Sequence, residues 1–141
     1  MPGDRYPFEQ TIEVAFRDLD AMGHVNNAVY FSYMETLRIK YMAKLLHIKK
    51  LHQLPIIVAE ATCAYKSPLV YGETVRAGVG VSRFGTKSFD LVYRLETTDG
   101  RLAATGKTVQ VVYNYQTGQT APVPDDFKAR VRAYQGDWRP L

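Results

Sequence analysis

Residues 8–16 alternate between largely hydrophobic and largely polar positions, which predicts a strand with one buried face. The face expected inside comprises Phe8, Gln10, Ile12, Val14 and Phe16. Turn-forming residues fill positions 17–27. From about Asn27 to about His47, hydrophobic residues recur at spacings of three and four, which predicts a helix surrounded by other structure. Its apolar stripe comprises Tyr30, Met34, Leu37, Tyr41 and Leu45, widened by Phe31, Met42 and Leu46.

The ends of this helix carry the expected signals. Asn26 is a good N-cap residue, and Lys49 and Lys50 follow the C-terminal end, where the helix dipole favours positive charge. After Pro55 the chain becomes rich in Val, Thr, Tyr and Phe, which predicts four more strands. We expect them over residues 56–65, 73–84, 87–96 and 102–115.

The loops between the predicted strands and the C-terminal segment also carry recognisable signals. Residues 68–72 form a loop long enough to cross between strands, and Thr98-Asp99-Gly100 is a hairpin signal. A short helix is predicted over residues 127–134, opened by Asp125 and Asp126. The fold class is therefore α+β, with an antiparallel sheet wrapped around one helix.

Composition narrows the class of protein. A chain of 141 residues, 46% of them hydrophobic, is expected to form a single domain over residues 1–141. The net charge of +4 favours a phosphate-bearing partner without demanding nucleic acid. A single cysteine, Cys63, excludes an intrachain disulfide and suits a reducing compartment. With no signal peptide and no apolar run near the ~20 residues of a membrane helix, we expect a cytoplasmic protein without a membrane span.

Asp18 and Asp20 are the most informative polar residues. If the alternation of the first strand continues, both fall in phase with its hydrophobic residues, where burial raises the pKa of a carboxyl group and sharpens its chemistry. The alternative is that an aspartate only holds the turn by accepting hydrogen bonds from nearby amides. We favour the turn role for Asp18 and the chemical role for Asp20.

The start of the helix explains the preference for Asp20. The first N–H groups of a helix have no partner within it, and with the helix dipole they form an anion site. Gly23 permits tight backbone just before Asn26 and Asn27. A carboxylate beside amides that face a developing oxyanion is a plausible arrangement for acyl transfer.

The stretch Asp18-Leu19-Asp20-Ala21-Met22-Gly23-His24-Val25-Asn26-Asn27-Ala28-Val29-Tyr30 resembles the hotdog-fold acyl-CoA thioesterases of the 4-hydroxybenzoyl-CoA thioesterase type. The His-Val-Asn-Asn portion is also similar to acyl-carrier-protein thioesterases. Residues 55–58, 65–73 and 84–89 extend the resemblance over most of the chain. The prototype 4-hydroxybenzoyl enzymes lack the His-Val-Asn-Asn sequence, so their aromatic substrate does not carry over.

The resemblance implies a hotdog fold, in which a five-stranded antiparallel sheet wraps around one long central helix. It implies homodimers joined edge to edge, with active sites at the interface, and it leaves open whether two dimers associate. The substrate would be a thioester of coenzyme A or of acyl-carrier protein, with coenzyme A as part of the substrate and no separate cofactor. Asp20 would act as nucleophile or general base, and the backbone N–H of Asn27 would hold the oxyanion.

The same resemblance gives supporting catalytic roles to His24 and Asn26. For His24, orienting water and capping the loop are equally open. Glu35 lies two helical turns beyond Asn27 and could reach the same pocket, although a pair with Arg38 at i+3 is the simpler interpretation. Arg83 and Lys87 flank a hairpin and could meet the phosphates of coenzyme A, as basic residues near this hairpin do in the family.

Other candidates for chemistry are weaker. Cys63 lies in a strand without a histidine nearby in sequence, so we expect an apolar filler and not a nucleophile. Glu60 shares the phase of Val58 and could enter a partner's site, but a solvated position is favoured. His47 and His52 have a poor ligand spacing and no third partner, so no metal site is predicted.

The leading hypothesis is thus an acyl-CoA thioesterase. One alternative keeps the fold and changes the reaction to hydration of enoyl thioesters, although the spaced Asp and His motif of those enzymes is missing. The other is a non-catalytic ligand-binding or RNA-binding module that uses Arg130 and Arg132. The modest charge and the lack of interleaved aromatic and basic residues argue against nucleic acid.

Overall fold

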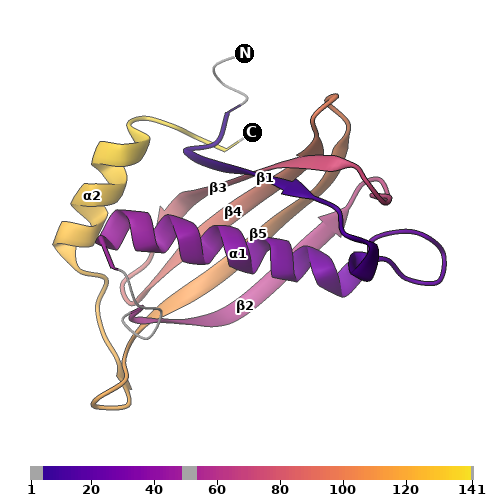
Figure 1. Ribbon diagram of the computed structural model, residues 1–141. Helices are drawn as coiled ribbons and strands as arrows, with labels where there is room; N and C mark the ends of the chain where they lie inside the picture. The colour runs from indigo at the N-terminus through magenta and orange to yellow at the C-terminus, as the bar shows by residue number, and fades with distance from the viewer. Residues whose placement is uncertain (1–4, 49–53, 141) are drawn as a thin grey trace.

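The structure, a computed structural model, describes residues 5–48 and 54–140. One antiparallel sheet dominates it, with the strand order β1-β3-β4-β5-β2 and a short strand, β6, paired to β5 (Figure 1). The strands are β1 (Phe8–Glu13), β2 (Ile56–Tyr65), β3 (Thr74–Phe84), β4 (Ser88–Thr97), β5 (Leu102–Asn114) and β6 (Gln119–Thr120). The outer strands of the main path are β1 and β2, so β2 forms one edge of the sheet.

Helix α1 (Asn27–Leu46) lies across one face of the sheet (Figure 1). Its predicted stripe is buried except at Leu46, which is half-buried, and Phe31, which is exposed. The helix approaches the sheet closely at Gly106, where an added Cβ atom would overlap the Met34 side chain. The sheet wrapped around this long helix is the hotdog fold that the resemblance implies, with β6 as an addition to the expected five strands.

Helix α2 (Asp125–Gln135) packs at the C-terminal end of α1 (Figure 1). Its Phe127 ring lies against Phe89 of β4, with 5.0 Å between ring centroids. Gln135 donates to the Val81 carbonyl and accepts from the Val81 amide and the Tyr41 hydroxyl. These contacts join α2 to both the sheet and α1. Neither α1 nor α2, the helices of the described ranges, is long and apolar enough to cross a membrane.

The segment after β1 differs from the prediction. The strand ends at Glu13, and Phe16–Asp18 form a turn of 3-10 helix, so the alternation does not continue to Asp18 and Asp20. Phe16, which we expected inside, is 78% exposed. The physical reason is local: the Asp18 carboxylate accepts the Ala15 amide at 3.0 Å, which favours a turn over a strand. The other predicted strand and helix ends agree within about two residues.

Candidate active site

Asp18 anchors the chain between β1 and α1. Besides the Ala15 amide, its Oδ2 atom accepts the hydroxyl of Tyr33 at 2.7 Å, and its carbonyl accepts the Asn26 amide at 2.9 Å. Tyr33 is buried on α1, and burial, followed by the bond to Asp18, raises its pKa. The hydroxyl therefore stays protonated and donates to the carboxylate. The turn role expected for Asp18 is confirmed.

Asp20 lies in the same segment between β1 and α1, and its side chain is exposed to solvent. Its Oδ1 atom accepts the backbone amides of Met22 at 2.9 Å and His24 at 3.3 Å, while its own amide donates to the His24 carbonyl at 2.8 Å. Gly23 completes this tight turn with a φ of +80°. Among the hydrogen bonds of the described residues, Oδ2 has no donor. Asp20 is exposed, so the expectation of a buried carboxylate is wrong for the single chain.

The first turn of α1 contains a backbone amide, that of Asn27, for which the described residues supply no acceptor. Asn26 is the N-cap, as predicted, because its side chain accepts the Ala28 amide at 2.8 Å and its carbonyl accepts the Val29 amide at 2.9 Å. Within the described part of the chain, the Asn27 amide has no acceptor. This N–H group, at the positive end of the helix dipole, is suited to bind an anion.

Asp20 and Asn27 meet in one open pocket of about 260 Å³. One side comes from the start of α1 and the segment before it, and the other from the end of β2 and the loop that follows. The pocket is lined by Asp20, His24, Val25, Asn27, Tyr30, Tyr65, Lys66, Ser67 and Pro68. The structure therefore brings together Asp20, His24 and Asn27, three of the predicted catalytic residues, and places the Asn26 cap directly beside them.

Two tyrosines, Tyr30 and Tyr65, are among the residues that line this pocket. The Tyr65 hydroxyl donates to the Asn27 carbonyl at 2.8 Å, and its ring lies edge-on to Tyr30 at 5.0 Å between centroids. Burial raises the pKa of Tyr30, so its hydroxyl remains neutral at physiological pH. The tyrosines shape the pocket and fix the first turn of α1.

The second side of the pocket was not among the predicted site residues. Tyr65, Lys66, Ser67 and Pro68 are distant in sequence from Asp20, and only the contact between the loop after β2 and the start of α1 brings them near. The available signal was a basic residue placed directly after a predicted strand, at the beginning of a crossing loop. Lys66 is thus a cation in the pocket of Asp20 for which the sequence pattern predicted no role.

Glu35 does not line the pocket with Asp20. It is exposed on α1 and forms an ion pair with Arg38, with 3.8 Å between Oε2 and Nη2, as the simpler interpretation predicted. Both residues line a separate pocket of about 530 Å³ between α1 and the beginning of β2. At ~1.5 Å per residue, the stretch of helix from Asn27 to Glu35 amounts to about 12 Å along the axis, which carries Glu35 beyond a pocket built on the first turn.

Arg83 and Lys87 lie at the other end of the sheet. Phe84 belongs to the same stretch of chain, and its ring packs on Phe127 of α2. Helix α2 in turn covers the C-terminal end of α1 (Figure 1). Arg83 is 3.7 Å from the buried carboxylate of Asp90, and Lys87 donates to Thr120 at 3.5 Å. Within one chain, neither residue reaches the pocket that contains Asp20.

Of the weaker candidates, Cys63, Glu60 and His47 do not line the pocket that contains Asp20. Cys63 is a half-buried residue of β2, and burial raises the pKa of its thiol, which opposes formation of the nucleophilic thiolate. Glu60 is exposed on β2. His47 is the left-handed C-cap of α1, with a φ of 54°, whereas His52, Lys49 and Lys50 lie outside the described residues. Within residues 5–48 and 54–140, no group of three His, Cys, Asp or Glu side chains is arranged to hold a metal ion.

Comparison with known proteins places this chain in a family. The profile of the thioesterase-like superfamily matches residues 14–131. The chain is 31% identical over 123 residues to the uncharacterized protein YsmA of Bacillus subtilis (strain 168), covering 87% of this chain and 84% of that protein.

Solved structures agree with this assignment. A thioesterase from Thermus thermophilus, in complex with coenzyme A and zinc, is 36% identical with a TM-score of 0.84, and each chain is covered completely. A gentisyl-coenzyme A thioesterase is 25% identical with a TM-score of 0.77, covering 88% of this chain and 99% of that one. The chain belongs to the thioesterase-like superfamily, and its enzyme class is that of a thioester hydrolase.

Proposed function

We propose that this protein hydrolyses an acyl-CoA thioester to a free acid and coenzyme A, with Asp20 as the reacting carboxylate. The observation that carries the proposal is that Asp20 and Asn27 line one pocket. Among the hydrogen bonds of the described residues, one oxygen of the Asp20 carboxylate has no donor and the Asn27 backbone amide has no acceptor. Hydrolysis of a thioester needs these two groups, one to activate the attack and one to stabilise the negative oxygen that results.

Two routes use the same groups. As a general base, Asp20 takes a proton from a water molecule while the water oxygen attacks the thioester carbon. As a nucleophile, its carboxylate attacks the carbon directly, the thiolate leaves, and water then hydrolyses the mixed anhydride. In both routes the carbonyl oxygen gains negative charge, and the Asn27 N–H stabilises it. His24 and Asn26 support the reaction by holding the Asp20 turn and the start of α1.

Coenzyme A is the proposed carrier. The Thermus thermophilus thioesterase, at 36% identity over the whole chain, was crystallised with coenzyme A, which supports a CoA thioester here. Lys66 lines the pocket and offers a positive charge for a phosphate group of such a substrate. Arg83 and Lys87 would take part only if a second subunit brought them to the pocket.

We further propose that the working unit is a homodimer joined through β2. This strand is ten residues long, forms an edge of the sheet, and is exposed over residues 57–62. A long, exposed, apolar edge strand is a template for pairing with another chain, and Ile57 and Val58 are exposed there. A molar mass in solution of twice the 16.0 kDa of the chain, or a further doubling if dimers pair, would agree with this assembly.

The reaction can be tested on a panel of thioesters. Release of coenzyme A is measured with aromatic, short-chain and long-chain acyl-CoA for the wild-type protein and for Asp20→Asn. We expect hydrolysis of at least one class, and a loss in kcat on the order of several hundredfold or more for the variant, as for removal of a base or nucleophile. Full activity of Asp20→Asn would refute the role of Asp20. Hydration of crotonyl-CoA without thiol release would refute hydrolysis itself.

A further inference from the structure

The side of the pocket opposite the start of α1 is formed by Tyr65 and by the beginning of the loop of residues 66–73, whose position depends on long-range contacts. Ser67 and Pro68 of this loop line the pocket. Farther along, the Leu69 carbonyl accepts the Val25 amide at 2.9 Å, and Val70 forms an isolated β-bridge with His24. The loop therefore contacts the segment that contains the Asp20 turn, one residue before the cap of α1.

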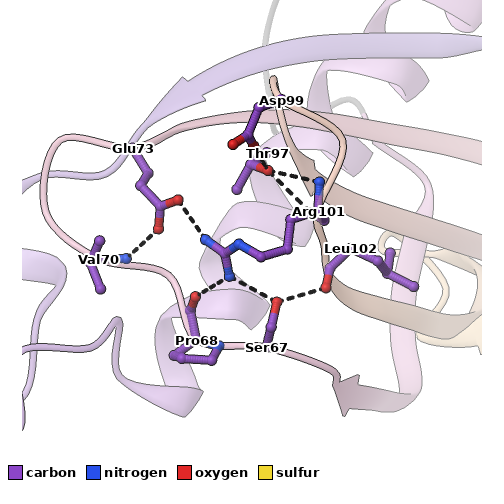
Figure 2. Close-up of polar contacts among 8 residues, drawn as sticks. All are labelled: Ser67, Pro68, Val70, Glu73, Thr97, Asp99, Arg101 and Leu102. Atoms are coloured by element: carbon purple, nitrogen blue, oxygen red, sulfur yellow. Dashed lines mark hydrogen bonds and ion pairs between the residues drawn. The ribbon is translucent and has the colours of Figure 1, made fainter.

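Arg101, in the hairpin between β4 and β5, forms polar contacts with this loop (Figure 2). Its Nη1 atom donates to the Pro68 carbonyl at 2.6 Å and to Ser67 Oγ at 2.9 Å, and Nη2 forms an ion pair with Glu73. Arg101 thus contacts both ends of the loop through one planar guanidinium group. It does not itself line the pocket with Asp20.

The partners of Arg101 are held in turn. The second carboxylate oxygen of Glu73 accepts the Val70 amide at 2.8 Å, and the Ser67 hydroxyl donates to the Leu102 carbonyl at 2.7 Å (Figure 2). The Arg101 amide donates to Thr97 Oγ1 at 2.9 Å, which fixes the hairpin. The cluster joins the hairpin to Val70, the residue that bridges to His24.

We propose that Arg101 is a positioning residue for the hydrolytic reaction: it fixes the loop of residues 66–73 and, through Leu69 and Val70, the separation between Asp20 and the Asn27 amide. This inference rests on the proposed function of the pocket. The expected sizes of the two effects, on stability and on rate, favour a kinetic role for Arg101 over a purely structural one. A partly exposed ion pair contributes little to stability, whereas a displacement of about 1 Å at a reacting group costs on the order of a hundredfold in rate.

A matched control exists on another part of the sheet. Arg76 of β3 also forms ion pairs with glutamates, Glu96 of β4 and Glu9 of β1. Its side chain is 40% exposed, against 39% for Arg101. None of these three residues lines the pocket with Asp20. Arg76→Met therefore measures what the loss of an arginine–glutamate ion pair, here with a more deeply buried glutamate, does to the fold alone.

The test measures kcat, KM and Tm for wild type, Arg101→Met, Arg101→Lys and Arg76→Met, with the acyl-CoA that the wild type hydrolyses fastest. We expect kcat of Arg101→Met to fall by about a hundredfold, with a much smaller change in KM. Arg101→Lys should recover part of this loss, because an ammonium group can replace some but not all of the three contacts. Arg76→Met should lower Tm at least as much as Arg101→Met, because it removes one of the two arginines beside the buried Glu96 carboxylate. It should leave kcat within about twofold, since it touches no pocket residue.

If Arg101→Met and Arg76→Met have the same kcat, the positioning role is wrong. Should Arg101→Met fail to fold, Arg101→Lys and Glu73→Gln decide the question, because both keep the loop contacts in part and should lower kcat with KM nearly unchanged. A wild type that hydrolyses no thioester contradicts the proposed function and removes the reaction that Arg101 would serve. An active wild type with an unimpaired Arg101→Met contradicts only the inference about Arg101.

Discussion

The segment between β1 and α1 has two halves that the chain uses differently, although each contains an aspartate and the two lie two residues apart. In the first half, Asp18 accepts the Ala15 amide of the segment itself and the Tyr33 hydroxyl of α1 through a single oxygen, so both hydrogen bonds serve to hold the segment in place. In the second half, Asp20 holds a tight turn with Oδ1 and lines an open pocket. The same type of side chain thus fixes the segment at position 18 and lines the candidate active site at position 20. The difference comes from Tyr33 on α1, which reaches Asp18.

The largest expected effect concerns the amide that shares the pocket with Asp20. Asn27 is the first residue of α1, a position where proline is favoured because its missing N–H has no helical role. Asn26 has φ and ψ of −59° and 138°, which suits a residue before proline. Asn27→Pro should therefore preserve the helix and remove the oxyanion donor, with a loss in kcat of about 10² to 10³.

The matched control for this change is Asn27→Ala, which keeps the N–H and removes only the side chain. Steady-state kinetics with one acyl-CoA should place Asn27→Ala near wild type. Equal losses in the two variants would mean that the side chain, and not the amide, is the group that matters.

The next effect concerns the framework half of the segment. Asp18→Ala removes an ionised acceptor and leaves the buried Tyr33 hydroxyl without its partner. We expect the free energy of unfolding, measured by urea denaturation, to fall by about 2–3 kcal/mol, and kcat of the folded protein to fall less than about tenfold, because the pocket groups remain. Unchanged stability with abolished activity would reverse the roles given to the two aspartates.

A smaller effect is expected for the other end of the same contact. Tyr33→Phe keeps the ring in the core and removes only the hydroxyl, while Asp18 retains the Ala15 amide. The free energy of unfolding should fall by about 1 kcal/mol. The double variant Asp18→Ala/Tyr33→Phe should lose less unfolding free energy than the sum of the two single-variant losses, since both changes remove one shared interaction. Additive losses would show that Tyr33 and Asp18 stabilise the fold independently.

Most of the fold could be predicted because periodicity and turn residues are local signals. The helix start at Asn27, its Asn26 cap and the span of β2 agree with the structure. Phe16 could not be placed, because a hydrogen bond from the Ala15 amide to Asp18 competes with strand pairing, and the alternation of residue types does not record it.

The candidate site was predictable only on its local half. Asp20, His24 and Asn27 are neighbours in sequence and share the pocket. Lys66 and Ser67 enter it through the contact between a crossing loop and the segment before α1, and Arg101 acts through that loop from a hairpin 34 residues beyond Ser67. Such a contact depends on how the sheet is paired, which no spacing along the chain encodes. Glu35 shows the converse, because helical spacing suggests a shared face while the axial distance separates it from the pocket.

The most direct test of the role of Asp20 compares Asp20→Asn with Asp18→Asn. Both changes neutralise one carboxylate at nearly constant volume, two residues apart. Turnover of the best acyl-CoA substrate and the free energy of unfolding are measured for both variants. We expect Asp20→Asn to lose kcat on the order of several hundredfold or more and to keep its stability, whereas Asp18→Asn should lose stability and keep most of its turnover. Retention of kcat by Asp20→Asn, or an equal loss in both variants, would contradict the role of Asp20.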